Sequence, residues 1–278
     1  MQNFLSQHSD FLIHWTGNDI DNSFDKHWND SGKHHLETSK EAQHLYIERL
    51  KNILRYGFWY TKEPSYEISH SRGKIIVPEV SRICFTELRL SQSLYHASRY
   101  GRLGVGVKRP FVFNSYGKVM NYFGYANDKT NDPFLWECSQ AFSDKNQLGY
   151  FKPMNSHSNK LNYDLYSESE WRIVAHNNEM YHNYIDISNC QNENIKQYIL
   201  KCMENNKFAG LKPLDGWFAM IIYPCLNIKN YCQHDEEIIN LIRNTRLYDT
   251  SNATEVEGRG FRYGNLPIEL NLASTLHF

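Results

Sequence analysis

Short apolar runs alternate along this chain with longer segments whose apolar residues recur at helical spacing, which limits the fold to a mixture of strands and helices. The clearest helix is expected to begin at the capping box Thr38-x-x-Glu41 and to end at Gly57. The longest apolar run, WFAMIIYPCL at 217–226, is too short to cross a bilayer and is expected to contain a buried strand over 217–224. The buried face of the helix is expected to consist of Ala42, Tyr46, Leu50, Ile53 and Leu54.

The remaining elements follow the same two patterns. Further strands are expected at 11–15, 74–77, 82–85, 103–107, 119–125 and 172–175. Further helices are expected at 89–101, from Pro133 to about Phe142, at 193–206 and at 234–247. The polar segment 18–37, which holds His27, His34 and His35, is expected to be a solvated loop, and 144–165 is expected to be a second loop. The sequence therefore predicts a single α+β domain over residues 1–278, with a motif-bearing core at 11–175 and a C-terminal part at 176–278 that completes the fold or forms a partner surface.

Charge and cysteine content exclude several classes of protein. Lys and Arg total 30 against 31 acids, so a chain-wide basic surface for nucleic acid is excluded, whereas a local basic groove is not. The six cysteines include no CxxC pair and no zinc-type spacing, which indicates reduced thiols and no metal. The N-terminus lacks the basic and apolar regions of a signal peptide, so we expect a cytoplasmic protein without a membrane segment.

Two acids lie two positions apart in the segment YSESEWRIV, residues 166–174. On an extended strand, positions i and i+2 point to the same side, so Glu168 and Glu170 would share one surface. Like charges at that distance repel and shift each other's pKa, which costs stability. The ordinary interpretation is a solvated entrance to a strand, and the alternative is an acidic functional site.

Four motifs occur in a recognisable order, which includes these acids. They are HWTG at 14–17, ILRYGF at 53–58, ICFTELRLSQSLYHA at 83–97, and Glu168-Ser169-Glu170. This order resembles the ADP-ribosyltransferase superfamily, in which a strand ending His-Gly-Thr precedes a helix with an Ile-Leu-x-x-Gly end, a strand-turn-helix with a Tyr or Ser on its strand, and a late catalytic Glu. The resemblance implies a mixed β core of two packed sheets with flanking helices.

The resemblance also implies a chemistry and a role for each matching residue. The reaction breaks the bond between nicotinamide and ribose in NAD, a co-substrate, through a transition state with oxocarbenium character like that of glycoside hydrolysis. Glu170 would stabilise that positive charge, and Glu168 would orient or deprotonate the acceptor. The residues expected to bind NAD are His14, Thr16, Cys84, Thr86, Ser93, Tyr95 and Arg82. Arg82 would hold the diphosphate, with Arg55 and Arg72 as the other possibilities.

The chain departs from the superfamily pattern at two places. His14 is followed by Trp-Thr instead of Gly-Thr. The strand position that carries Tyr or Ser in the best-known transferases is Cys84 here, or is shifted to Thr86, so Tyr95 becomes the candidate ring for stacking on nicotinamide. Taken alone, Cys84 is expected to be a small buried apolar residue, because no cysteine-protease signature joins it to His14 or His96.

A second resemblance covers residues 11–175. The segment VPEVSRICFTELRLSQSLYHASRYGRLGVGVKR at 77–109, followed by EWR at 170–172, is similar to the AbiGi-type abortive-infection family of bacterial phage defence. This resemblance implies a toxin–antitoxin system, with the transferase as toxin and a cognate antitoxin protein as partner. The family's name instead implies a non-catalytic antitoxin or partner-binding protein on the same fold, and an NAD glycohydrolase is a third alternative.

A block of basic residues suggests the acceptor. Arg82, Arg89, Arg99, Arg102, Lys108 and Arg109 lie within 82–109, opposed by Glu87 alone and interleaved with Tyr95, Tyr100, Phe111 and Phe113. Such a mixture suits single-stranded nucleic acid, with Arg89, Arg99 and Arg102 as the expected contacts, whereas the ordinary interpretation is a solvated helix face. RNA or single-stranded DNA is slightly favoured over protein as acceptor, although the paired acids fit both classes.

Overall fold

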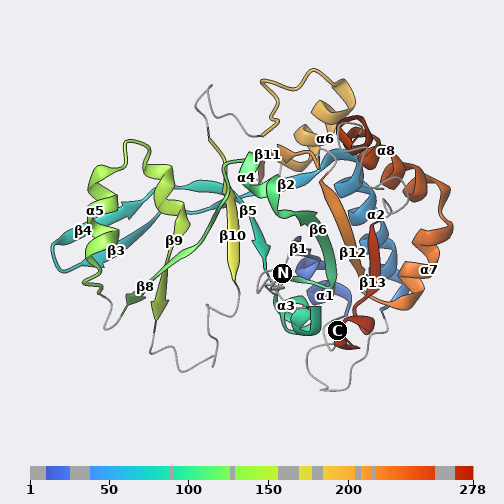
Figure 1. Cartoon of the computed structure of the whole chain (residues 1–278), viewed down its shortest axis with the longest axis horizontal. Coiled ribbons are helices and arrows are strands. Elements are labelled where there is room, and N and C mark those ends of the chain that lie inside the picture. The colour runs from blue at the N-terminus through green and yellow to red at the C-terminus, as the bar shows by residue number, and fades with distance from the viewer. Residues whose placement is uncertain are drawn as a thin grey trace, which may run out of the picture. The chain divides into compact units, whose positions relative to one another are not determined.

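The structure, a computed structural model, is a mixture of strands and helices, as the sequence predicts (Figure 1). It describes residues 11–25, 38–87, 90–125, 129–155, 169–176, 184–203, 208–214, 217–253 and 267–277. The chain divides into two compact units. The first unit comprises residues 1–57, 85–111 and 213–278, and the second comprises 58–84 and 112–212.

The first unit contains a sheet in which β6 (Leu103–Lys108) lies between two partners. It pairs antiparallel with β1 (Phe11–Thr16) and with β12 (Phe218–Tyr223), and β13 (Ile268–Asn271) pairs parallel with β12. A side chain at Gly106 would place its Cβ 2.7 Å from that of Met220. The LGVGV segment is therefore a strand that packs closely against its neighbour.

The helices of the first unit include α2 (Lys40–Tyr56), whose buried residues are the five that the sequence predicts. Its cap is Ser39, and not Thr38: the Ser39 hydroxyl accepts the Ala42 N–H over 3.2 Å. Gly57 ends the helix with a φ of 98°. The other helices are α1 (Asn18–Phe24), the 3₁₀ turn η1 (Leu90–Gln92), α3 (Ser93–Tyr100), α7 (Leu226–His234), α8 (Glu236–Ala253) and η7 (Ser274–His277).

The second unit is built on strands β2 (Phe58–Glu63) and β5 (Val80–Thr86), the last two residues of which belong to the first unit. β2 pairs antiparallel with β5 and with β11 (Phe208–Lys212). β10 (Glu170–Val174) pairs with β5 and, antiparallel, with β7 (Lys118–Val119). The remaining elements are α4 (Arg109–Asn114), which begins in the first unit, β3 (Tyr66–His70), β4 (Gly73–Val77), β8 (Asn121–Tyr125), α5 (Pro133–Ala141), η2 (Lys145–Tyr150), β9 (Phe151–Asn155) and α6 (Glu193–Met203).

The structure corrects two expected loops. Residues 18–24 form α1, although they are polar, and the rest of 18–37 lies mostly outside the described residues. In the segment 144–165, η2 and β9 occupy 145–155, and residues from 156 onward lie outside the described residues. Within the described ranges, no helix is long and apolar enough to cross a membrane.

Candidate functional site

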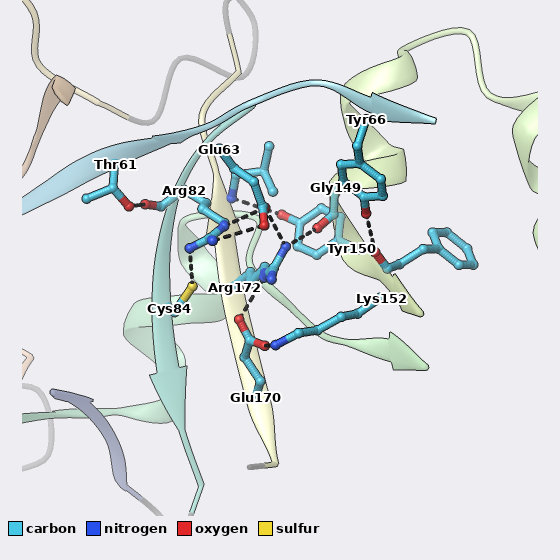
Figure 2. A network of polar contacts seen from close by, with 12 residues as sticks. Thr61, Glu63, Tyr66, Arg82, Cys84, Gly149, Tyr150, Lys152, Glu170 and Arg172 are labelled. Carbon is cyan, nitrogen blue, oxygen red and sulfur yellow. Dashed lines mark hydrogen bonds and ion pairs between the residues drawn. The ribbon is translucent and has the colours of Figure 1, made fainter. Parts of the chain in front are cut away.

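Five charged side chains of the second unit form one continuous network around Glu170, which we call the Glu170 network (Figure 2). In order of contact, its members are Arg82, Glu63, Arg172, Glu170 and Lys152. Positive and negative groups alternate along it, so each carboxylate lies between two cations. Three cations face two carboxylates, and a net positive charge remains.

Strand geometry brings two of the members together. Glu170 and Arg172 lie two residues apart on β10, so both side chains point to the same face of the strand. The backbone of β10 is fixed at both ends, because Met120 donates its N–H to the Glu170 carbonyl over 2.9 Å and Ala175 donates to the Ser81 carbonyl over 2.8 Å.

Arg172 is the centre of the network. Its Nε donates to Glu170 Oε1 over 2.7 Å, and its Nη1 donates to Glu63 Oε2 over 2.9 Å and to the Gly149 carbonyl over 2.8 Å. Its side chain is only 3% exposed. A guanidinium held by three acceptors in a dry environment has one orientation, so Arg172 fixes both carboxylates.

Arg82 closes the network at one end. Its Nε and Nη2 donate to the two oxygens of Glu63 over 2.6 and 3.0 Å, which is the bidentate geometry of a strong ion pair. Its Nη1 lies 2.9 Å from the Sγ atom of Cys84.

Glu170 is a nearly buried carboxylate that remains ionised. Its side chain is 7% exposed, and the second oxygen, Oε2, accepts from the Lys152 ammonium over 3.0 Å. Burial alone would raise its pKa, but the nearby charges of Arg172 and Lys152 outweigh burial and lower the pKa to about 2. At neutral pH the group is therefore a fixed negative charge and does not transfer protons.

Cys84 is a neutral thiol beside this carboxylate. Burial raises its pKa to about 11, with the Glu170 charge adding to the increase and the Arg82 charge opposing it. A thiol with such a high pKa is a poor nucleophile, which argues against cysteine-protease chemistry. Within the described ranges, no group of three or more His, Cys, Asp or Glu side chains could hold a metal ion.

Three of the predicted site residues, Glu170, Arg82 and Cys84, thus lie together in the second unit. The other predicted NAD-binding residues that the structure describes belong to the first unit. These are His14, Thr16, Thr86, Ser93 and Tyr95.

Hydroxyl and ring contacts within the first unit involve several of those residues. Thr86 accepts from the Trp15 indole over 3.1 Å and donates to the Ile13 carbonyl over 3.3 Å. The Thr16 hydroxyl accepts from Arg49 over 3.0 Å. The His14 and Phe85 rings form a T-shaped contact with centroids 5.9 Å apart.

Exposure separates the two remaining residues, which lie on α3. Ser93 is buried, whereas Tyr95 is 45% exposed. Tyr95 is therefore the more accessible of the two to a ligand.

Two predicted site residues, Glu168 and Arg89, lie outside the described residues. The extended geometry that would put Glu168 and Glu170 on one surface begins only at Glu170, where β10 starts. The residue between them, Ser169, has a left-handed φ of 41°. The condition under which both acids would share one surface, an extended backbone through Ser169, is therefore not met at Ser169 itself, and Glu168 lies outside the described residues.

Arg102 is not a nucleic-acid contact, contrary to the sequence prediction. Its side chain is fully buried and bonds to Asp21, Asp25 and the Thr38 hydroxyl, so it has no surface to offer to a phosphate. Arg99 is half-buried, with its guanidinium 5.4 Å from the centroid of the Tyr100 ring.

Sequence reasoning missed three members of the network: Glu63, Lys152 and Arg172. The sequence does contain a signal for Arg172, which is a charged residue inside the apolar run WRIV. It lies two positions from Glu170, the spacing of side chains on one face of a strand, and a charge on a buried strand needs a partner. Glu63 and Lys152 had none, since each reaches the site from a distant part of the chain.

No protein-family model matches this chain, and the searches of curated proteins and of solved structures found no significant similarity.

Proposed function

We propose that the chain is an NAD-dependent ADP-ribosyltransferase in which Glu170 is the essential acid. The observation that carries this proposal is a carboxylate that is 7% exposed, ionised at neutral pH and held in one orientation by Arg172. Cleavage of NAD leaves positive charge on the ribose, and a fixed carboxylate in a dry environment stabilises such a charge far better than one in water.

The ionisation of Glu170 defines how it would act. With a pKa of about 2, it would stabilise charge and accept a hydrogen bond from a ribose hydroxyl, and it would not serve as the general base. Each carboxylate oxygen has two acceptor positions, so an oxygen that already accepts from Arg172 or Lys152 retains capacity for a hydroxyl. Any proton transfer from the acceptor falls to Glu168 in this proposal.

The order of the four sequence motifs supports a specific fold within the α+β class. We propose that the α+β mixture is the ADP-ribosyltransferase fold with two packed sheets. His14, Thr16, Thr86 and Tyr95 would contact NAD, and Arg82 would act on the diphosphate.

The biological setting follows from the abortive-infection resemblance. The transferase would be the toxin of an anti-phage system, and a cognate antitoxin protein would restrain it. The acceptor is proposed to be RNA or single-stranded DNA. With Arg102 buried, this acceptor proposal rests on Arg89 and Arg99 among the three expected contacts.

One observation favours a second candidate function. Both oxygens of Glu170 already bond to cations of the protein, an arrangement that also stabilises a sheet when no ligand is present. Together with Cys84 at the position of the stacking Tyr, this favours a non-catalytic partner-binding protein on the same fold. An NAD glycohydrolase, which would use water as acceptor, shares the Glu170 chemistry.

The test uses the purified full chain and its Glu170→Gln variant, each incubated with labelled NAD and separate pools of RNA, single-stranded DNA and lysate protein. The matched control is Glu137→Gln, which alters an exposed carboxylate of the second unit. We expect the wild type and the control to label one pool, and Glu170→Gln to lose activity by about 10²–10³-fold. Circular dichroism would show that Glu170→Gln remains folded.

The alternatives give different results in the same experiment. NAD consumption without any labelled pool would establish the glycohydrolase, and intact NAD with undetectable NAD binding would replace the transferase by the partner-binding protein. Equal labelling by the wild type and Glu170→Gln would remove Glu170 from the mechanism. Expression alone should arrest growth for the toxin, and Glu170→Ala should relieve the arrest.

A further inference from the structure

A groove of about 420 Å³ lies beside strand β4 in the second unit. None of the residues that line it belongs to the Glu170 network. One wall consists of Lys74, Ile75, Ile76 and Pro78. The opposite wall comes from the end of α5 and from η2, including Lys145 and Leu148. Figure 1 shows β3, β4 and α5 in this part of the fold.

The residues of the first wall place the groove along the edge of β4. Successive side chains of a strand point to opposite faces, so a hollow above one face would contact every second residue only. Here Lys74, Ile75 and Ile76 all line the groove, so it follows the edge between the two faces. β4 pairs with β3 along its whole length, and among the described residues no strand pairs with its second edge.

The groove is positively charged. Lys74 and Lys145 contribute to its two walls, and none of its lining residues is acidic. Lys145 donates to the Ser139 carbonyl over 2.6 Å, which fixes one of the three N–H groups of its ammonium. Lys74 contacts Glu67 over 3.0 Å, but both side chains are exposed, so this pair exchanges readily for another carboxylate.

We propose that the β4 edge binds an extended, acidic peptide segment of a partner protein by adding it as a strand. Main-chain hydrogen bonds to an exposed edge supply affinity in this mode, and alternate side chains supply specificity. Lys74 and Ile76 share the outer face, and Ile76 is 58% exposed, so two residues of the segment that lie two positions apart on this face would be acidic beside Lys74 and apolar beside Ile76. Pro78 limits the pairing, because proline has no N–H to offer to a ladder.

Charge argues against a second copy of this chain as the occupant. Pairing two β4 edges would bring the lysines of both grooves together, which disfavours self-association. A lysine and a proline at an edge are also the features that prevent aggregation, and they leave the edge open to a segment of opposite charge. The proposal does not depend on Glu170 and stands whether or not the chain transfers ADP-ribose.

The experiment measures binding of a labelled peptide of about seven residues, in which Glu and Val alternate along one face and Thr occupies the other, by fluorescence anisotropy with the full chain. The double variant Lys74→Glu/Lys145→Glu should bind at least about tenfold more weakly than the wild type. The matched control, Lys201→Glu, alters an exposed lysine of the second unit outside the groove and should bind like the wild type. A peptide of the same charge with a central proline should also lose binding, since it cannot complete the ladder.

Hydrogen exchange locates the bound peptide. Among residues 74–77, the amides that point away from β3 should become more protected in the complex, because a new strand shields the edge that they form. No peptide binding, equal binding by the charge-reversed variant, or protection confined to other residues would overturn the proposal. So would binding of a single-stranded oligonucleotide that the peptide does not displace, because the groove would then be a nucleic-acid site.

Discussion

Arg172 Nε and Glu170 Oε1 lie 2.7 Å apart, so two residues on one face of β10 neutralise each other where almost no water reaches them. The pair also connects two neighbouring contacts, since Arg172 reaches Glu63 and Glu170 reaches Lys152. Removing Arg172 therefore takes one of two cations away from each carboxylate, and removing Glu170 takes one carboxylate away from both Arg172 and Lys152.

Replacing Arg172 with Met should destabilise the chain strongly. The substitution keeps apolar volume but removes the cation between Glu170 and Glu63, and breaking a buried ion pair typically costs about 3–5 kcal/mol. Urea unfolding would measure the change in the free energy of unfolding. The control is Arg72→Met, whose pair with Glu137 is exposed on both sides and should contribute less than about 1 kcal/mol. Equal losses for the two variants would contradict a special role of the Glu170 network.

The stability that Glu170 contributes should disappear in acid. Its pKa falls from 4.5 to about 2 on folding, so the contribution is fully present above about pH 4.5 and is lost as the pH falls towards 2. The size is on the order of 3 kcal/mol. The difference in unfolding free energy between the wild type and Glu170→Gln, measured in urea at a series of pH values, should shrink across that interval. A difference that stays constant across this interval would mean that Arg172 and Lys152 do not lower the pKa of Glu170.

Replacing Arg102 with Met should strongly destabilise the first unit. The effect is on folding, because the buried side chain makes no contact with nucleic acid. Arg102 is fully buried and bonds to Asp21 and Asp25, so two carboxylates would lose their cation. We expect a loss of roughly 3–5 kcal/mol, measured by thermal or urea unfolding. Arg99→Met, on the same segment but half-buried, should cost less than about 1 kcal/mol. A wild-type unfolding curve for Arg102→Met would refute the buried assignment.

Gly101→Ala should be among the most damaging small substitutions in the first unit. Gly101 has a φ of 104°, and an added Cβ would lie 2.3 Å from the Asn18 nitrogen and 2.4 Å from Gly17 backbone atoms. Because backbone atoms cannot give way cheaply, the unfolding free energy should fall by more than about 2 kcal/mol. Gly124→Ala is the control, since a Cβ there meets nothing within 4 Å. A similar melting temperature for both variants would contradict the close approach.

Cys84 should react slowly with iodoacetamide at pH 8 and faster in Glu170→Gln. Burial raises its pKa to about 11, and the Glu170 charge contributes to this increase, so only roughly 0.1% of the thiol is ionised at pH 8. Removing the charge lowers the pKa and increases the thiolate fraction. Mass spectrometry of the peptide that contains Cys84 would measure the rate, with the urea-unfolded chain as reference. A native rate equal to the unfolded one would contradict the shift.

Elements with a local pattern were predictable from the sequence, and elements held by distant contacts were not. The buried face of α2 follows from helical spacing alone, and its five residues are confirmed. α1 was missed because its sequence, NDIDNSF, is polar, and its buried Asp21 is stabilised by Arg102, which lies 81 residues away. No window of sequence contains that interaction.

The same distinction applies to the candidate site. Glu170 was singled out because it stands at the front of a short apolar run and matches the late acid of the motif order, and it is the first residue of β10. Glu63 reaches Arg172 across 109 residues of chain, and no spacing rule connects them. Glu168 was grouped with Glu170 on the condition of an extended backbone; Ser169 has a φ of 41°, and Glu168 itself lies outside the described residues. Local periodicity therefore predicts single residues of such a site, while the pairing of strands decides their partners.

The first unit is assembled from three separate stretches of chain, and this has a consequence for its synthesis. β6 lies at 103–108, but its partner β12 is translated only after all of residues 112–212 have been synthesised. The sheet that contains His14 therefore stays incomplete until nearly the end of translation, and the late closing of such distant contacts slows folding. A chain that terminates before residue 213 lacks β12 altogether. For a protein proposed to be toxic, an unfinished copy would then be an inert one.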